Sequence, residues 1–284
     1  DWSSEVCSSD LPLVSIGGGN MAQALIQGWL PHGLPASRLH VVEPNPDLRQ
    51  QLHAQHHLNV HADASTAPVD AAFVLWAIKP QIFQSVAQPL AGRFAHALHL
   101  SVAAGVRSDS LARWLGSQRV VRAMPNTPAL IGLGQTALFA RADVTETEKT
   151  RVQQLMQSIG ESLWLADESL MDAVTALSGS GPAYVFYFIE SLIHAGVGMG
   201  LDANQARQLA IGTVVGAAAL AQRGPESPQT LREKVTSQGG TTHAALTQMQ
   251  ADGFAVLVDK ALRAAQARSW ELGNSLDQTE KKHG

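Results

Sequence analysis

The sequence predicts a doubly wound α/β domain over residues 11–166, built on a parallel sheet, followed by an all-helical domain over residues 167–274. Three observations carry this prediction. In the first half, short apolar or β-branched runs alternate with amphipathic stretches, the pattern of crossover units around a parallel sheet. These runs stop after about Asp167. Long stretches rich in Ala, Leu and Gly then continue to Leu272, which indicates helices.

Both ends of the chain are expected to lie outside the two domains. Residues 1–10 show no periodicity and are expected to be a non-native or disordered leader, and residues 275–284 are expected to form a polar, frayed tail. The single cysteine, Cys7, falls in the leader, which excludes a disulfide framework and a thiol nucleophile in the folded part and favours a cytoplasmic protein. The formal net charge of -4, without a basic stripe, argues against nucleic acid, and no apolar run reaches the roughly 20 residues of a membrane helix.

Seven short runs are predicted to be the strands of the first domain. They cover residues 13–16, 39–43, 72–78, 97–103, 119–124, 136–140 and 162–166. Helices are expected between most of them, among them residues 21–30 and 145–159. The second of these helices opens with a capping pattern in which Thr145 precedes Glu148 by three positions.

A glycine-rich stretch, SIGGGNMAQAL, follows the first predicted strand and opens the first helix. Gly17 permits a tight turn, Gly19 lets the backbone approach a pyrophosphate, and the helix N-terminus offers free N–H groups to it. Ala22 is small enough to pack the helix against the strand. In this position the stretch predicts a Rossmann-type dinucleotide site.

The end of the second predicted strand bears on the choice of cofactor. Glu43 stands 26 positions after Gly17. Its carboxylate can accept hydrogen bonds from a ribose 2′-OH and would repel a 2′-phosphate, which taken alone favours NAD(H). Asn45 and Arg49 follow closely and would instead meet a phosphate if the loop turns Glu43 away.

Three further strand ends are expected on the same edge of the sheet, where ligands of doubly wound domains bind. WAIKPQ places Lys79 and Pro80 there, and SVAAGV follows the next strand. In RAMPNTPALIG two prolines fix the backbone around Asn126 and Thr127, which indicates a rigid wall beside a ligand.

Two uncharged helix starts characterise the second half. In LSGSGPAYVFYFIES, Ser180 is placed to cap a helix whose first turn holds Pro182. In VTSQGGTTHAAL, Gly239 and Gly240 precede a helix expected from about Thr241.

The free N–H groups of the second of these helices, with the hydroxyls of Thr241 and Thr242, can bind a small carboxylate without an arginine. The hydroxyl of Thr242 can also donate to a substrate nitrogen. The plain alternative is that Ser180 and Thr241 only cap their helices.

Small residues are dense on the predicted helices, as in GTVVGAAALA, and favour a partner subunit, although a single monomeric core stays an alternative. No metal site is expected. His53, His56, His57 and His61 have no cysteine or carboxylate beside them in a zinc pattern and are interpreted as a solvated helix face. The sequence contains no G-x-S-x-G elbow and therefore gives no hydrolase signature.

With IGGGNM, AIKP, SVAAGV, MPNTPAL, SGSGPAYVF and TSQGGTT in this order, the chain resembles the pyrroline-5-carboxylate reductases over about residues 13–272. The resemblance implies a Rossmann domain and an intertwined helical dimerisation domain, with homodimers often assembled into rings. It implies hydride transfer from NADPH or NADH to the C=N bond of the cyclic imino acid, giving L-proline in the last step of proline biosynthesis.

The resemblance also assigns residues at the matching positions. Those implied to hold the cofactor are Gly17, Gly19, Asn20, Met21, Lys79, Pro80, Ala103, Gly105 and Asn126. Those implied for the substrate are Ser180, Ser237, Gly239, Gly240, Thr241 and Thr242, with Thr242 near the imine nitrogen. Glu226 resembles a glutamate that some members keep near the active site. Two departures are Gln238, where a proline is usual, and Glu43, which argues against NADPH.

Two other classes stay open at this point. A different Rossmann-type dehydrogenase or imine reductase, such as a relative of the β-hydroxyacid dehydrogenases, would carry a catalytic lysine early in the second domain. No lysine occurs between Lys149 and Lys234. A non-catalytic NAD(P)-binding dimer would bind the cofactor without turnover.

Overall fold

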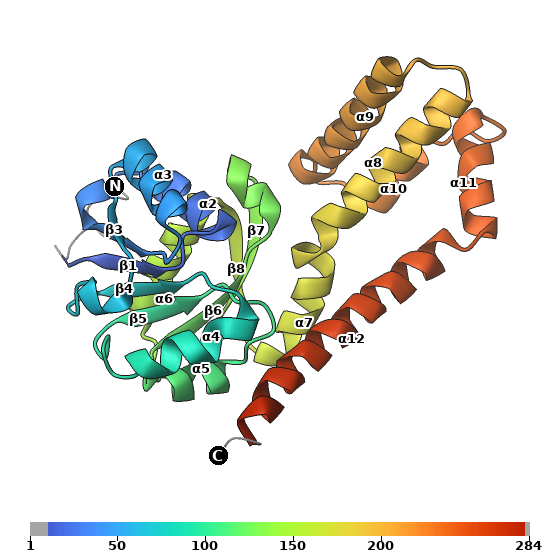
Figure 1. Cartoon of the computed structure of the whole chain (residues 1–284). Helices are drawn as coiled ribbons and strands as arrows, with labels where there is room; N and C mark the ends of the chain where they lie inside the picture. The colour runs from blue at the N-terminus through green and yellow to red at the C-terminus, as the bar shows by residue number, and fades with distance from the viewer. Residues whose placement is uncertain (1–10, 282–284) are drawn as a thin grey trace. The chain divides into compact units, whose positions relative to one another are not determined.

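The computed structural model describes residues 11–281, with side chains up to residue 276, so the expected leader at residues 1–10 lies outside the described residues. Within that range the chain forms two compact units (Figure 1). One takes the chain up to Ser180 and again from Ala265, and the other is Gly181–Ala264. The division differs from the boundary expected after residue 166 in two ways: residues 167–180 belong to the first unit, and the last helix, α12 (Phe254–Lys281), returns to it. That helix also continues through most of the segment expected to be a frayed tail.

The first unit is built on an eight-stranded sheet in the order β3-β2-β1-β4-β5-β6-β7-β8. Its pairs are parallel except β6 with β7, which is antiparallel. The strands are β1 (Leu13–Ile16), β2 (Leu39–Val42), β3 (Asn59–His61), β4 (Phe73–Trp76), β5 (Leu98–Ser101), β6 (Val120–Met124), β7 (Gly134–Ala140) and β8 (Gly160–Trp164). Seven of them confirm the predicted strands, and the doubly wound fold class is confirmed.

The sequence did not predict β3. This three-residue strand, Asn59–His61, lies at the edge of the sheet and carries polar residues at both ends. A short, half-exposed edge strand lacks the alternation of apolar and polar residues from which a strand is predicted.

Both faces of the sheet carry apolar layers, because successive side chains of a strand point to opposite faces. In β1, Leu13 packs on one face while Val14 and Ile16 pack on the other. The first layer is covered by α2 (Asn20–Trp29), α3 (Pro46–His56) and α6 (Glu146–Gln157), and the second by α4 (Pro80–Ala87) and α5 (Ser108–Leu115) (Figure 1). The sheet is thus buried on both faces, which leaves its carboxyl edge for ligands.

The second unit contains α8 (Gly181–Gly198), α9 (Ala203–Arg223), α10 (Pro228–Lys234), α11 (Thr241–Ala251) and the first part of α12. Asp202 and Gln205 form a capping box at the start of α9, and Gly196 lets α8 approach Ala206 closely. Many large apolar side chains of this unit are exposed, among them Phe186, Tyr187, Val215, Leu220 and Leu257. Among the described residues, no helix is both long and apolar enough to span a bilayer.

Candidate active site

The glycine loop after β1 has a backbone that only glycine allows. Gly17 has a φ of 100°, and a Cβ there would lie 2.4 Å from the carbonyl oxygen of Ala77. Its N–H donates to the carbonyl oxygen of Val42 over 2.8 Å, which fixes the turn. Gly19 precedes α2, and a Cβ there would meet no atom within 4 Å, so the space beside it is open. No side chain caps the start of α2, where Asn20 and Met21 form the first turn.

The carboxylate of Glu43 is turned toward this loop. Its oxygens accept hydrogen bonds from the backbone nitrogens of Gly18 and Asn45, each over 3.0 Å. The side chain of Asn45 caps α3, and the Arg49 guanidinium donates to the carbonyl oxygens of Glu43 and Pro44. The loop therefore holds a negative charge beside the glycine turn, with Arg49 engaged by the backbone.

The neighbouring strand ends bring the other residues expected for the cofactor to the same edge of the sheet. Lys79 is exposed and precedes α4, whose first residue is Pro80. Ala103, two residues after the end of β5, is buried, and its N–H donates to the hydroxyl of Ser101. Gly105 has a φ of 76°, and its carbonyl oxygen lies so close to Gly273 of α12 that a Cβ on Gly273 would come within 2.8 Å of it.

Asn126, which follows β6, is buried and engaged on both sides of its amide. The side-chain nitrogen donates to the carbonyl oxygen of Ser178 over 3.1 Å, and the side-chain oxygen accepts from the backbone nitrogen of Gln135 over 2.9 Å. Thr127 begins the short helix η4 (Thr127–Ile131). The segment that follows β6 is thus anchored by the Asn126 side chain.

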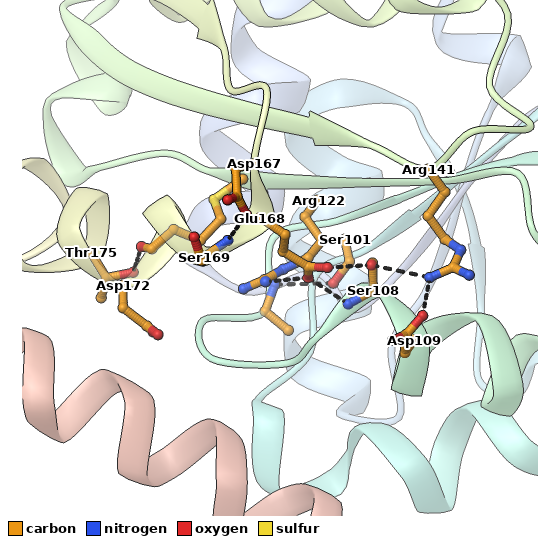
Figure 2. Close-up of polar contacts among 12 residues, drawn as sticks. Ser101, Ser108, Asp109, Arg122, Arg141, Asp167, Glu168, Ser169, Asp172 and Thr175 are labelled. Carbon is orange, nitrogen blue, oxygen red and sulfur yellow. Dashed lines mark hydrogen bonds and ion pairs between the residues drawn. The ribbon is translucent and has the colours of Figure 1, made fainter.

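A polar cluster around Glu168, in the short helix η5 (Glu168–Leu170), was not predicted from the sequence (Figure 2). The carboxylate accepts from the backbone nitrogen of Ser108 over 2.7 Å, from the Ser108 hydroxyl, and from the guanidinium of Arg122 over 2.5 Å. Arg141 donates to the Ser108 hydroxyl and pairs with Asp109. An arginine within the buried strand VVRAM was the available signal, because a buried charge needs a partner.

The helix start expected near Ser180 is confirmed, because α8 begins at Gly181 with Pro182 in its first turn, but the expectation that Ser180 caps this helix is wrong. The π-helix η6 (Thr175–Gly179) follows α7 (Met171–Val174) directly and leads into α8. Ser180 has helical angles (φ -89°, ψ -17°), and its N–H donates to the carbonyl oxygen of Thr175 over 2.8 Å. Ser180 thus joins the π-helical turn to α8, and its backbone N–H is engaged by Thr175.

The loop before α11 forms an open helix start in the second unit. Gly239 has a φ of 76°, and Gly240, not Thr241, is the residue that precedes the helix. The N–H of Gly240 donates to the carbonyl oxygen of Ser237, and a Cβ on Gly240 would lie 2.6 Å from the Ser237 hydroxyl. No side chain caps α11, so the plain interpretation of Thr241 as a cap is wrong, and Thr241 and Thr242 stand in the first turn.

The remaining candidates have other environments. Glu226 is ion-paired with Lys234. The four histidines do not share one helix face, because α3 ends at His56, His57 takes a left-handed conformation with a φ of 54°, and His61 belongs to β3. Within residues 11–276, no three His, Cys, Asp or Glu side chains group as metal ligands would.

The candidates thus form two groups, one in each compact unit. The glycine loop, Glu43, Asn45, Lys79, Pro80, Ala103, Gly105, Asn126 and Ser180 belong to the first unit. Glu226, Ser237, Gly239, Gly240, Thr241 and Thr242 belong to the second.

Family models match both parts of the chain. Residues 168–272 match the family described as pyrroline-5-carboxylate reductase dimerisation, and residues 13–105 match that described as NADP oxidoreductase, coenzyme F420-dependent.

Relatives of known name match almost the whole chain. The pyrroline-5-carboxylate reductase of Pseudomonas aeruginosa is 42% identical over 265 residues, which are 93% of this chain and 97% of that protein. The reductase of the same name from Haemophilus influenzae is 40% identical over 260 residues, covering 90% and 96%. The structure of the Coxiella burnetii pyrroline-5-carboxylate reductase superposes with a TM-score of 0.87 at 34% identity, covering 93% of this chain and 99% of that one. A Plasmodium falciparum pyrroline carboxylate reductase with NADP bound gives 0.83 at 29% identity, covering 93% and 98%.

Proposed function

This chain belongs to the pyrroline-5-carboxylate reductase family, and we propose how its own residues carry out the reaction of that family. The enzyme reduces the C=N bond of L-1-pyrroline-5-carboxylate with NAD(P)H and forms L-proline, the last step of proline biosynthesis.

The glycine loop fits a dinucleotide. Gly17 makes a turn that a Cβ would prevent, and the open space beside Gly19 leaves the uncapped N–H groups of α2 accessible to a pyrophosphate. Asn20 and Met21 stand in that first turn, while Lys79, Pro80, Ala103 and Gly105 follow the adjacent strands β4 and β5. When bound, the cofactor supplies the hydride.

The start of α11 is proposed to hold the substrate carboxylate. Its N–H groups have no side-chain cap, the helix dipole favours an anion there, and Ser237, Thr241 and Thr242 add hydroxyls. A Cβ on Gly240 would lie 2.6 Å from the Ser237 hydroxyl, so a larger residue there would displace this hydroxyl. Thr242 is proposed to donate a hydrogen bond to the lone pair that forms on nitrogen as the carbon of the protonated imine accepts hydride.

This division of roles needs no strong base and no metal ion. Reduction of a protonated C=N bond moves one hydride to carbon and leaves the proton on nitrogen. The protein therefore has to orient the imine against the cofactor, hold the substrate carboxylate and donate one hydrogen bond. The uncapped start of α11 beside two threonines is the observation that carries the proposal.

The helical unit belongs to the dimerisation family, and the chain forms a homodimer. Exposed apolar side chains such as Phe186, Tyr187 and Leu220 support a surface that a second copy covers. We further propose that dimers assemble into a larger ring, which mass photometry would resolve from a free dimer. A cytoplasmic location is proposed as well, supported by the single cysteine.

The direct test follows nicotinamide absorbance with purified enzyme and pyrroline-5-carboxylate, with NADH and NADPH run side by side and L-proline identified by chromatography. Oxidation that depends on the imine and yields proline is the expected result. Cofactor binding without oxidation would contradict the proposal and favour a non-catalytic NAD(P)-binding dimer. Reduction of NAD(P)+ by a β-hydroxyacid, without oxidation of NAD(P)H by the imine, would favour the other dehydrogenase class.

A further inference from the structure

The side chain of Asn126 connects three segments of the first unit. Its nitrogen donates to the carbonyl oxygen of Ser178 in the π-helix η6, and its oxygen accepts from the backbone nitrogen of Gln135 in β7. Asn126 itself follows β6 and is only 8% exposed. An amide that is buried and bonded on both sides has one orientation, so it can hold its partners in place.

The Ser178 carbonyl has a particular need for this donor. In a regular α-helix it would accept from the N–H four residues later, but that residue is Pro182, which has none. A polar backbone group inside a protein has to be paired. The Asn126 side chain supplies a proton donor that the sequence of the helix removes.

The turn that contains Ser178 is itself irregular. Thr175–Gly179 is π-helical, and the Ser180 N–H reaches back to the carbonyl oxygen of Thr175. Gly179 packs against Met124, two residues before Asn126, and a Cβ on Gly179 would lie 2.4 Å from the Met124 Cε. Single π-helical turns are uncommon and are frequently found at functional sites.

We propose that Asn126 is a positioning residue for Ser180. Its hydrogen bond to Ser178 selects the π-helical turn over a regular helix, and the wider turn sets where the Ser180 hydroxyl stands. This assigns Asn126 a role other than lining the cofactor. The inference rests on the proposed function in one respect, since it takes from the family resemblance that Ser180 binds the substrate of this reaction.

Two substitutions separate the contacts of the amide. Asn126→Asp keeps the oxygen that accepts from Gln135 and replaces the donor with a second oxygen facing the Ser178 carbonyl. Asn126→Ala removes both contacts. In each variant we expect amide exchange over residues 175–183 to rise at least tenfold and the KM for pyrroline-5-carboxylate to rise at least tenfold, while the Kd of NADH changes less than threefold. Gln135→Ala, which retains the backbone N–H that Asn126 binds, is the control and should leave all three near the wild-type values.

A double variant tests whether Asn126 selects the π-helical geometry or only supplies a hydrogen-bond donor to the Ser178 carbonyl. Pro182→Ala in the Asn126→Ala background gives the Ser178 carbonyl a helical donor. We expect slow amide exchange to return, because the turn becomes a regular helix, and the raised KM to persist, because Ser180 is displaced. Recovery of the KM as well would overturn the inference, as would a KM within twofold of wild type in Asn126→Asp.

The exchange measurement needs no substrate. If the wild type proved inactive with the imine, the proposed function would fail, and exchange alone would still decide whether Asn126 holds the π-helical turn. Unchanged exchange in Asn126→Asp, with full activity in the wild type, would reject the inference alone.

Discussion

A carboxylate oxygen of Glu43 lies 3.0 Å from the backbone nitrogen of Gly18 and accepts its proton. The other oxygen accepts from the backbone nitrogen of Asn45. The turn that would receive a dinucleotide therefore carries a fixed negative charge at the end of β2. In a Rossmann domain this is where the adenosine ribose binds, so the charge acts on the 2′-substituent.

We predict that NADH binds more tightly than NADPH and that Glu43→Gln narrows the difference by about tenfold, or ~1.4 kcal/mol, by removing like-charge repulsion. Fluorescence titration with both cofactors measures this, and the fragments ADP-ribose and 2′-phospho-ADP-ribose repeat it without the nicotinamide. Asp47→Asn, which removes one exposed charge from the start of α3, is the control. A wild-type preference for NADPH that Glu43→Gln leaves unaltered would show that Glu43 does not decide the choice of cofactor.

Removal of the Thr242 hydroxyl tests the proposed donor. We predict that Thr242→Ala lowers kcat about 100-fold, the usual cost of one hydrogen bond that strengthens in the transition state, and leaves the Kd of NADH unchanged. Thr242→Ser keeps the hydroxyl and should retain activity within a few fold. Steady-state kinetics with a parallel cofactor titration measure both, and full turnover in Thr242→Ala would remove this residue from the mechanism.

The sequence was sufficient wherever a local pattern reflects a local cause. The glycine loop, the strand ends at Lys79 and Ala103 and the open start of α11 were all predicted from turn chemistry and strand order. The capping box at Thr145 was predicted from spacing and is present. These features depend on residues within a few positions of one another, so their signals survive in the sequence.

Features that depend on distant residues could not be predicted in this way. Glu168 bonds to Ser108, 60 positions earlier, and Asn126 bonds to Ser178, 52 positions later. The sequence around Ser180 predicted the start of α8, but not the π-helical turn directly before it, whose Ser178 carbonyl is bonded by the distant Asn126. Contacts between distant segments therefore determine local structure that the local sequence alone does not predict.

Removal of the Glu168 carboxylate is predicted to destabilise the first unit. Arg122 has a side chain that is 9% exposed, and Glu168 is 24% exposed, so Glu168→Ala leaves a nearly buried guanidinium and the Ser108 N–H without this acceptor. We expect a loss of about 3 kcal/mol in the free energy of unfolding. Glu168→Gln keeps one acceptor and should lose about 1 kcal/mol.

Denaturant unfolding at one fixed protein concentration measures these losses, since dimer formation adds to apparent stability. Glu271→Ala breaks the ion pair with Arg268, in which both side chains are more than half exposed, and serves as the control. It should cost at most about 0.5 kcal/mol. Equal losses for Glu168→Ala and Glu271→Ala would show that the cluster in Figure 2 contributes no more than a surface pair.

The buried His99 predicts how stability depends on pH. Its Nδ1 accepts a hydrogen bond from the Trp76 indole over 3.1 Å, and burial lowers the pKa of His99 from 6.5 to about 4. The unfolded chain therefore binds a proton at this residue between about pH 6.5 and pH 4, whereas the folded protein does not. Stability is complete above the unfolded pKa and falls as the pH drops through this window, by about 3 kcal/mol in total.

We predict that His99→Asn, which can still accept from Trp76 but does not titrate, flattens the fall of unfolding free energy between pH 6.5 and pH 4. The variant should be less stable than wild type at pH 8, because its side chain is smaller and leaves a cavity, and should lose less on acidification. His96→Asn, at an exposed position three residues earlier, is the control and should keep the wild-type slope. If the pH dependence of the unfolding free energy were unchanged in His99→Asn, other groups would account for the acid sensitivity, such as His40 and His61, which are hydrogen-bonded to each other.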